Sequence, residues 1–229
     1  MLLDRGADYN KCDEDDTSSL NMACDRGYTE IVKMLNSEDV VRGADYNKCD
    51  EDDRSSLNMA CEQGHTEIVK MLLDKGADYN KYDKSGQSPV MKVCYHGHTE
   101  IVKMLLDKGA DLNKCDCSGK SPLIKACEHG HTEIVNLLLD KEADYNKCDE
   151  YDRSSLNMAC DRGYTETVKM LLDRGADYNK CDEDDTSSLK MACDRGYTEI
   201  VKMLLDRGAD YNKCDEDDRS SLNMACDRG

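Results

Sequence analysis

Asp173-Arg174-Gly175-Ala176-Asp177-Tyr178-Asn179-Lys180-Cys181-Asp182 is the stretch of sequence that decides the fold. Near-copies of this decapeptide begin at five other aspartates: Asp4, Asp74, Asp107, Asp140 and Asp206. A further, degenerate copy ends at Asp50. From Asp74 onward the copies follow one another every 33 residues. A sequence that repeats with a period of this length is built from stacked supersecondary units rather than around one globular core.

The copies divide the chain into repeats if the aspartate that ends each copy is taken as the first residue of the next repeat. The complete repeats are then 13–49, 50–82, 83–115, 116–148, 149–181 and 182–214, with partial repeats at 1–12 and 215–229. We predict a single array over 1–229. Neither end has the polar capping repeat that an array normally needs for solubility, so we expect a fragment of a longer array or fraying of the terminal half-repeats. Extra residues around 36–41 are expected to enlarge one loop of the first repeat.

The longer of two predicted helices in each repeat is typified by 198–205. Its apolar residues follow one helical face: Ile200, Val201, Leu204 and Leu205. We expect Thr198 or one of its neighbours to cap the start of this helix. Gly208 is expected to close its end in the left-handed conformation.

The shorter predicted helix is typified by 187–193. Ser187 is its expected N-cap, and the inward-facing residues are expected to be Leu189, Ala192 and Cys193. In two repeats the residue after this serine is a proline, Pro89 or Pro122, which is favoured as the first residue of a helix. Each repeat is therefore predicted to be a turn, a short helix, a tight loop and a longer helix.

These motifs resemble the ankyrin repeat family. One repeat carries nearly the whole family pattern: Ser121-Pro122-Leu123, Ala126, Gly130-His131, Ile134-Val135, Leu138-Leu139 and Ala143-Asp144-Tyr145-Asn146. The resemblance covers essentially the whole chain and recurs six times. It implies an all-α solenoid of stacked helix-loop-helix units with short β-hairpin fingers along one edge. It also implies a concave binding surface lined by the fingertips and by the ends of the short helices.

Two positions depart from the family pattern. The turn glycine survives only as Gly86 and Gly119, and elsewhere an aspartate replaces it: Asp16, Asp53, Asp152 or Asp185. If this position needs a positive φ, aspartate tolerates it better than most residues but less well than glycine. Glu142 stands where the helix-closing glycine belongs, at an expected cost of about 1 kcal/mol.

Charge and composition exclude several classes of partner. The chain has 49 acidic and 31 basic residues, for a formal net charge of -18, which repels the phosphates of nucleic acids and anionic membranes. No apolar run is long enough for a membrane span, and 1–5 do not resemble a signal peptide. Without an export signal the 14 cysteines are expected to be reduced thiols. We therefore expect an intracellular, cytoplasmic location.

The cysteines recur at two repeat positions, and Cys117 stands apart from both series. Equivalent sulfurs in neighbouring repeats should lie roughly 10 Å apart, the spacing of packed helices. This spacing is too long for a disulfide or for two ligands of one zinc ion. The cysteines that follow alanine, such as Cys193, are therefore predicted to be small core residues. No cofactor or metal is expected.

Runs of acidic residues mark most of the predicted fingers, as in Asp50-Glu51-Asp52-Asp53 and Asp182-Glu183-Asp184-Asp185. Three interpretations are open. The runs are a solvated face, or they recognise a basic peptide or domain, or they bind calcium through clustered carboxylates. The spacing of an EF-hand loop is absent, which weakens the third interpretation.

The two middle repeats break the pattern of the array and supply the candidate contact residues. Tyr95 and His96 end one short helix and are the best candidate anchors, because tyrosine is enriched at interfaces. The other candidates lie at the end of the next short helix or in the fingers: Glu128, His129, Lys84, Lys120, Glu51, Asp52, Arg54, Glu150, Tyr151 and Arg153. The alternative is that the middle repeats are the least recently duplicated copies and carry no special role.

The leading functional hypothesis is a non-enzymatic binding module that presents an acidic concave surface to a protein partner, in particular a basic segment. The alternatives are a structural spacer or spring, and the targeting part of a signalling protein whose catalytic domain lies outside this chain. No motif for catalysis, phosphate binding or a small-molecule substrate is present. His65, His98 and His131 occupy a loop position where tyrosine substitutes in other repeats, which indicates packing rather than catalysis.

Overall fold

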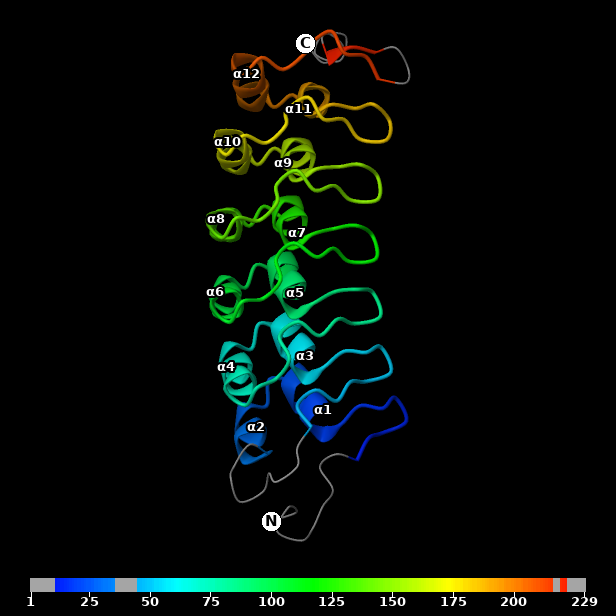
Figure 1. Ribbon diagram of the computed structural model, residues 1–229, viewed down its shortest axis with the longest axis vertical. Coiled ribbons are helices and arrows are strands. Elements are labelled where there is room, and N and C mark those ends of the chain that lie inside the picture. Colours follow the sequence, from blue (N-terminus) through cyan, green and yellow to red (C-terminus); the bar gives the residue numbers. More distant parts are fainter. Residues whose placement is uncertain (1–10, 36–44, 216–218, 222–229) are drawn as a thin grey trace. The chain divides into compact units, whose positions relative to one another are not determined.

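A computed structural model describes residues 11–35, 45–215 and 219–221, in which the chain forms stacked pairs of helices (Figure 1). The chain divides into two compact units, 1–111 and 112–229. The predicted fraying of the terminal half-repeats and the enlarged loop around 36–41 fall mainly outside the described residues, and both stay predictions.

Each unit contains six of the described helices. In the first unit they are α1 (Ser19–Asp25), α2 (Thr29–Leu35), α3 (Ser56–Gln63), α4 (Thr66–Asp74), α5 (Pro89–His96) and α6 (Thr99–Asp107). In the second unit they are α7 (Pro122–Glu128), α8 (Thr132–Asp140), α9 (Ser155–Arg162), α10 (Thr165–Asp173), α11 (Ser188–Arg195) and α12 (Thr198–Asp206). From α3 onward a shorter helix alternates with a longer one, and the predicted all-α repeat architecture is confirmed.

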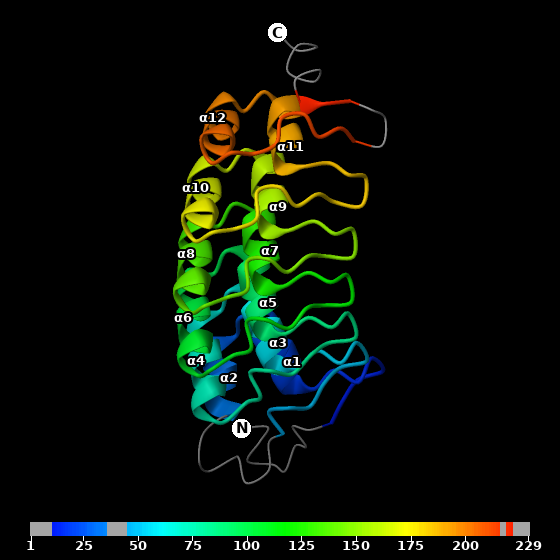
Figure 2. The same cartoon turned by 45° about the horizontal axis from the view of Figure 1, so that its top comes forward.

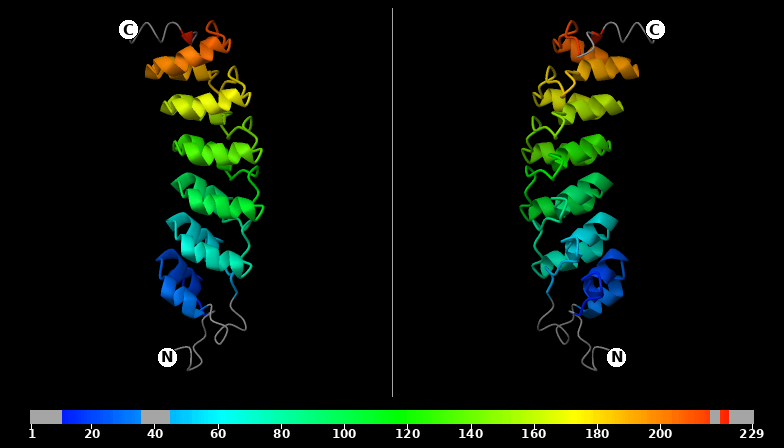
Figure 3. Two further views of the ribbon diagram at one scale, coloured as in Figure 1. Left: turned by 90° about the vertical axis from the view of Figure 1, so that its left-hand side faces the viewer. Right: turned by 90° about the vertical axis from the view of Figure 1, so that its right-hand side faces the viewer.

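Within each unit the short helices stack on one another and the long helices form a second row. The short helices α1, α3 and α5 pack in sequence in the first unit, as α7, α9 and α11 do in the second. The finger loops project from the short-helix side (Figure 2). The long helices lie one above the next within each unit (Figure 3).

The short helices begin as predicted. The hydroxyl of Ser187 accepts a hydrogen bond from the Lys190 N–H and caps α11. Pro89 and Pro122 are the first residues of α5 and α7, where a missing N–H costs nothing.

The N-cap of the long helix is the residue before Thr198, one of the neighbours that the prediction allowed. Thr198 is the first residue of α12, and the N-cap is Tyr197, which makes no side-chain capping bond. The Thr198 N–H donates to the Gly196 carbonyl at 2.9 Å, and this tight turn places Tyr197 at the cap position. In α10 the same arrangement leaves the ring of Tyr164 packed on Gly130 of the preceding repeat. The cap position is therefore used for packing between repeats.

The core follows the predicted helical faces. In α6 the four apolar residues of the face are all buried: Ile101, Val102, Leu105 and Leu106. In α12 only Ile200 and Leu204 are buried, and Leu205 is 42% exposed. This difference arises because no later long helix packs on α12 within the described part of the chain.

The cysteines at the repeat position of Cys193 are core residues, as predicted, where the structure describes them: Cys24, Cys61, Cys94, Cys127, Cys160 and Cys193. The last of the series, Cys226, lies outside the described residues. Burial raises the pKa of the Cys24 thiol to about 12. Such a thiol stays protonated near neutral pH and is chemically inert.

The fingers have less strand pairing than the predicted β-hairpins. Five of them are closed by a single β-bridge, such as Cys181 to Ser187. The first aspartate organises each turn, because the Asp182 Oδ1 accepts hydrogen bonds from the N–H groups of Asp184 and Thr186 at 3.1 and 2.8 Å. The turn requires a positive φ at its fourth residue, which is 54° at Asp185 and 73° at Gly86.

Asparagine side chains connect successive repeats. The Asn47 Oδ1 accepts from the Asp78 N–H at 2.8 Å, and the Asn113 Oδ1 accepts from the Asp144 N–H at 2.9 Å. These bonds join residues 31 positions apart. The asparagine of the decapeptide therefore fixes the register of one repeat on the next.

Candidate functional site at the fingers and short-helix ends

The candidate site consists of the fingers, which project beside the short helices within each unit (Figure 2), and of the C-terminal ends of the short helices. Glu51, Asp52, Arg54 and Lys84 belong to fingers of the first unit, and Tyr95 and His96 end its helix α5. Lys120, Glu150, Tyr151 and Arg153 belong to fingers of the second unit, where Glu128 and His129 end helix α7. The two sets are described separately.

Neighbouring fingertips are joined through their main chains. The Glu51 N–H donates to the Asp15 carbonyl at 3.1 Å, and the Lys84 N–H donates to the Asp52 carbonyl at 3.0 Å. In the second unit the Glu183 N–H donates to the Tyr151 carbonyl at 3.0 Å. Helix spacing alone does not predict this contact. It holds the exposed acidic side chains of successive tips in a fixed register.

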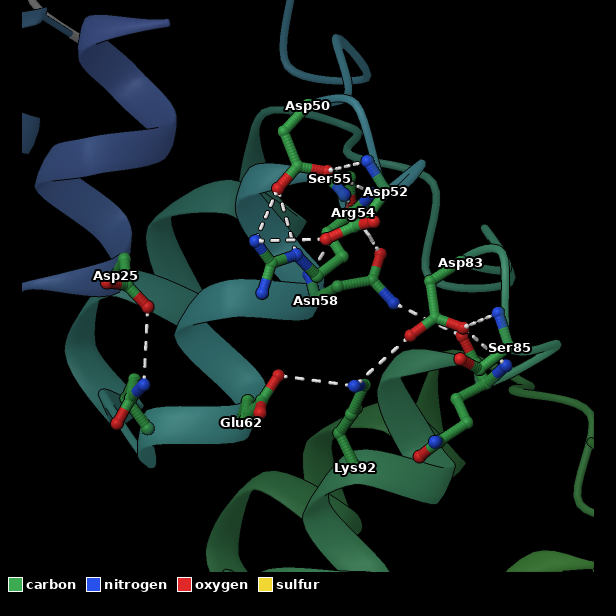
Figure 4. Close-up of polar contacts among 12 residues, drawn as sticks. Asp25, Asp50, Asp52, Arg54, Ser55, Asn58, Glu62, Asp83, Ser85 and Lys92 are labelled. Atoms are coloured by element: carbon green, nitrogen blue, oxygen red, sulfur yellow. Dashed lines mark hydrogen bonds and ion pairs between the residues drawn. The ribbon is translucent and has the colours of Figure 1, made fainter. Parts of the chain in front are cut away.

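A cation lies on the first aspartate of most fingers. The Arg54 Nη2 lies 2.7 Å from the Asp50 Oδ2, and the Arg153 Nη2 lies 2.7 Å from the Asp149 Oδ2. Figure 4 shows the pair formed by Arg54 and Asp50 at the base of their finger. Both arginines are candidate contact residues, and both already neutralise a buried aspartate.

In the middle repeats the cation comes from the short helix instead. The Lys92 Nζ lies 3.1 Å from the Asp83 Oδ2 and 3.2 Å from a Glu62 carboxylate oxygen (Figure 4). The Lys125 Nζ lies 2.8 Å from the Asp116 Oδ2. Neither lysine was identified from the sequence, although a lysine within an otherwise apolar helix face was a signal that could have revealed both.

The pKa of Asp116 shows what this lysine does. Burial acts to raise the pKa of the carboxyl group, but the hydrogen bond and charge of Lys125, with the Lys120 N–H, outweigh burial and hold it below its ordinary value. The carboxylate is therefore ionised and stabilised within the folded repeat.

Asp182 has no such cation. Thr186 occupies the arginine position of its finger, and Met191 occupies the position of Lys92 and Lys125 in its short helix. Burial raises the pKa of Asp182 above its ordinary value, and the N–H groups of Thr186 and Asp184 do not compensate fully. This residue was not singled out from the sequence, although an alignment of the repeats reveals the missing cation.

A cavity of about 360 Å³ opens beside Asp182 in the second unit. Its lining combines the finger base with the ends of α9 and α11: Asp161, Asp182, Thr186, Lys190, Met191, Asp194, Arg195 and Arg219. Arg195 contacts Asp161 at 2.8 Å, and Arg219 contacts Asp215 at 3.1 Å. Lys190 also contacts Asp215.

The two predicted anchors contact each other at the end of α5. The rings of Tyr95 and His96 meet edge to face with centroids 4.8 Å apart, and His96 stacks on His98 at 5.8 Å. Tyr95 is 43% exposed. The pair is thus an exposed aromatic surface on an ordered helix end.

The other middle-repeat candidates engage one another. Glu128 lies 2.7 Å from the Lys120 Nζ, and fewer than one fifth of each side chain is exposed. The His129 Nδ1 lies 3.0 Å from the Lys125 carbonyl. Tyr151 carries the Arg153 guanidinium over its ring at 4.8 Å.

The loop histidines pack between repeats, in agreement with the expectation from the sequence. The His98 Nε2 lies 3.2 Å from the Glu62 carbonyl. A side chain on Gly64 would meet the ring of His98 at 2.5 Å. These histidines therefore lie in a close contact between repeats.

Over the described ranges, with their gaps at both ends and at 36–44, no group of three or more His, Cys, Asp and Glu side chains is arranged to hold a metal ion. None of the helices described is long and apolar enough to cross a membrane.

Comparison with known proteins gives a consistent result. The family model described as ankyrin repeats in three copies matches residues 1–83, 75–149 and 144–215. The crystal structure of the human ASB11 ankyrin repeat domain is similar, with a TM-score of 0.81 and 28% sequence identity. This match covers 91% of the present chain and 92% of that one. The comparison with curated proteins found no match.

Proposed function

The chain belongs to the ankyrin repeat family, whose repeats are generally protein–protein interaction modules, and from this premise we propose that it binds a basic segment of a protein partner through its fingers. Ankyrin repeat domains are typically non-enzymatic binding modules, and we propose no catalytic role for these residues. The location proposed is intracellular.

The observation that carries this proposal is the fixed register of exposed acidic fingertips. Glu51 and Asp52 follow Asp15 in the first unit through a tip-to-tip hydrogen bond, and Glu183 follows Tyr151 in the second. More than half of the Asp52 side chain is exposed. A preformed row of carboxylates attracts a cationic segment without the cost of ordering the row on binding.

Many basic residues of the chain are already neutralised internally, which leaves the fingertips acidic. The long helices pair their charges between repeats: Arg174 with Asp140 at 2.6 Å and Arg207 with Asp173 at 2.5 Å. The finger arginines Arg54 and Arg153 pair with buried aspartates. The net charge of -18 is therefore carried in large part by exposed acids outside these pairs.

Binding of an octalysine peptide at increasing ionic strength tests this proposal. Affinity should fall steeply between roughly 0.01 M and 1 M salt, as the Debye length shrinks from about 30 Å to about 3 Å. The double variant Glu51→Gln, Asp52→Asn should weaken binding. The matched control Glu67→Gln, Asp74→Asn removes the same charge from the long helix α4 and should have less effect. Equal effects of the two variants would contradict a finger surface.

Tyr95 and His96 are the proposed anchors for the partner. Replacing both with Ala should weaken binding to an identified protein partner by at least about 2 kcal/mol, because exposed aromatic residues on ordered elements often dominate interfaces. Tyr211→Ala serves as the control, since Tyr211 is also exposed but lies in a turn beyond α12. If the double variant binds the partner with unchanged affinity, Tyr95 and His96 are not anchors, and the proposal is reduced to binding by the acidic fingers.

A structural spacer is the second candidate function, and the hydrogen bonds between repeats favour it. Each asparagine bond, such as Asn80 Oδ1 with the Asp111 N–H at 3.0 Å, ties one repeat to the next. A spacer needs this stiffness and needs no affinity for a basic peptide. If the octalysine peptide does not bind at low salt, that result would therefore support the spacer over the binding module.

A further inference from the structure

The finger aspartates provide an internal comparison between repeats. In five fingers the Oδ2 of the first aspartate contacts a cation, at 2.7 to 3.1 Å: Asp50 with Arg54, Asp83 with Lys92, Asp116 with Lys125, Asp149 with Arg153 and Asp215 with Arg219. The repeats therefore place a cation at one recurring point, which they reach from two different positions in the sequence.

Asp182 breaks this rule while keeping the rest of the finger. Its Oδ1 accepts the same two main-chain hydrogen bonds as the other fingers, from Asp184 and Thr186. Its Oδ2 has no lysine or arginine nitrogen within ion-pair distance in the part of the chain that the structure describes. Thr17 takes the place of Thr186 in the first repeat, but there Asp13 is exposed to water and needs no cation.

Space for a missing cation is present beside Asp182. The cavity of about 360 Å³ is bordered by Asp182, Thr186 and Met191, the residues at the aspartate and cation positions of the other repeats. Its volume falls within the range of about 300–1,000 Å³ typical of ligand sites. The cations in its wall are committed elsewhere, because Arg219 and Lys190 contact Asp215 and Arg195 contacts Asp161.

We propose that this cavity is a subsite for an arginine side chain of the bound segment, whose guanidinium pairs with the Asp182 carboxylate. The inference rests on the proposed function and specifies one residue of the partner. The entering guanidinium occupies the point that Arg54, Arg153 or Arg219 fills in its own repeat.

Arginine fits this point better than lysine for a reason visible in the other fingers. The finger 215–219 has the same first four residues as 182–185, and the cation that it supplies to its own aspartate is Arg219, beside Lys190 of the preceding repeat. Among the cations that a repeat supplies to its own finger, lysine serves only in the two fingers with a turn glycine, 83–87 and 116–120. In the finger of Asp149 the Arg153 Nε and Nη2 both donate to one carboxylate oxygen, at 3.0 and 2.7 Å. A planar guanidinium can make this paired contact, and an ammonium cannot.

The protonation behaviour of the two kinds of finger supports this assignment. Burial raises the pKa of Asp182, whereas Lys125 outweighs burial at Asp116 and lowers the pKa there. An ionised Asp182 without a cation is therefore disfavoured by its surroundings. A guanidinium at the Oδ2 relieves this penalty, and the relief contributes to binding.

The test uses the full chain and a capped Gly-Arg-Gly peptide, with the main-chain amide signals of Asp184 and Thr186 followed by NMR. These two groups donate to the Asp182 carboxylate and report directly on it. We expect saturable shifts with the arginine peptide. Affinity for the matched peptide with neutral citrulline should be at least tenfold lower, and the lysine peptide should bind more weakly than arginine.

Two variants complete the test. Thr186→Arg rebuilds the internal pair of Arg54 with Asp50 and should abolish the shifts, while Thr17→Arg makes the same substitution in the first repeat and should not. Asp182→Asn keeps an acceptor for both N–H groups and removes the charge, and it should weaken binding at least tenfold. Thermal unfolding of each variant checks that the fold is retained.

The inference fails if the arginine peptide causes no shifts in the wild type, or if Thr186→Arg and Asp182→Asn bind it as the wild type does. The proposed function is judged separately by octalysine. The arginine test could fail while Thr186→Arg still shows salt-dependent binding of octalysine. That combination would support the acidic finger surface as a binding site and rule out the arginine subsite.

Discussion

At the scale of the residue, each finger depends on how its first aspartate is neutralised. The carboxylate is fixed by main-chain N–H groups of its own turn, as at Asp116, where the Ser118 and Lys120 N–H groups donate at 3.0 and 2.9 Å. The second carboxylate oxygen is available for a cation. Buried charge pairs of this kind are costly to break singly, because removing one partner leaves the other charge buried and alone.

Lys125→Met places at Asp116 the residue found at the equivalent position of α11, Met191. We expect a loss of about 3 kcal/mol in the free energy of unfolding at pH 7. The folded-state pKa of Asp116 is lowered in the wild type, so the ion pair contributes stability above the unfolded pKa of about 3.9 and loses it as pH falls through the folded pKa. The difference between the proteins should therefore shrink in acid.

Urea unfolding of both proteins near neutral pH and in acid measures this effect. Asp116→Asn in the Lys125→Met background should recover part of the lost stability, because it removes the orphaned charge. A loss of stability that is independent of pH would indicate that Lys125 contributes through its apolar stem instead.

Glu142 gives a second prediction at this scale. It adopts a φ of 62° at the position that glycine occupies after the other long helices. Glu142→Gly should raise the free energy of unfolding by about 1 kcal/mol, because the left-handed conformation costs a residue with a Cβ about 1–2 kcal/mol. Urea unfolding at constant m-value measures the gain.

The reverse change, Gly76→Glu, is the matched control for Glu142. Gly76 has a φ of 82°, and no atom lies within 4 Å of the position that a Cβ would occupy. Gly76→Glu should lower the free energy of unfolding by about the amount by which Glu142→Gly raises it. A neutral result at both positions would show that backbone conformation at the helix ends does not limit stability.

Much of the residue-level detail could be predicted from the sequence because its causes are local. Asp185 substitutes for glycine within one turn, and Ser187 caps a helix three residues from its bonding partner. The cation at Asp83 could not be predicted in this way, because Lys92 reaches it from a different element of the repeat. Asp182 was missed for the related reason that its distinctive feature is an absent partner.

At the scale of the element, the contact between repeats is made by an aromatic ring on a glycine. The ring of Tyr164, which precedes α10, lies where a side chain on Gly130 would be, at 2.6 Å. The exchange of histidine and tyrosine at this position could be identified from the sequence as packing. The sequence left the cap open between Thr198 and its neighbours, and the N-cap is Tyr197, where packing between repeats takes the place of a side-chain capping bond.

Gly130→Ala and Gly196→Ala separate the ring contact from backbone strain. The two glycines have nearly the same φ, 73° and 74°. A Cβ on Gly196 would have no atom within 4 Å, whereas a Cβ on Gly130 would meet the ring of Tyr164. Gly196→Ala should cost about 1 kcal/mol from backbone conformation. Gly130→Ala should cost about 1–3 kcal/mol more from overpacking.

Urea unfolding of these two variants measures the difference. Tyr164→Ala in the Gly130→Ala background should remove the extra cost that arises from the clash. Equal destabilisation by the two single substitutions would mean that the ring moves aside at no cost and does not position the repeat.

At the scale of the whole molecule, the net charge of -18 opposes the stacking of acidic fingers. Surface ion pairs such as Lys33 with Glu67 at 2.9 Å contribute little in water. Added salt should therefore stabilise the protein by screening repulsion between the tips more than it weakens these pairs. We expect the Tm to rise by about 2–4 °C at high salt, the shift that about 1 kcal/mol produces in a chain of this size.

Scanning calorimetry at low and high sodium chloride measures this rise. The variant Glu183→Gln, Asp184→Asn lowers the charge of one tip and should have a smaller salt dependence than the wild type. A Tm that falls with salt would show that ion pairs on the long helices outweigh the repulsion of the fingers.

The source of each finger cation has a consequence for how such an array grows. Arg54, Arg153, Lys92 and Lys125 neutralise an aspartate of their own repeat. Such a repeat contains both partners of its ion pair. Gene duplication can therefore copy it to any place in the array without leaving a buried charge unpaired. Residues 1–35 and 170–204 differ at a single position, Asn21 against Lys190, and Lys190 neutralises Asp215 of the following repeat. Arg219 also contacts Asp215 from its own repeat, so that repeat keeps a cation wherever it is copied, and the single substitution adds a second cation across the junction.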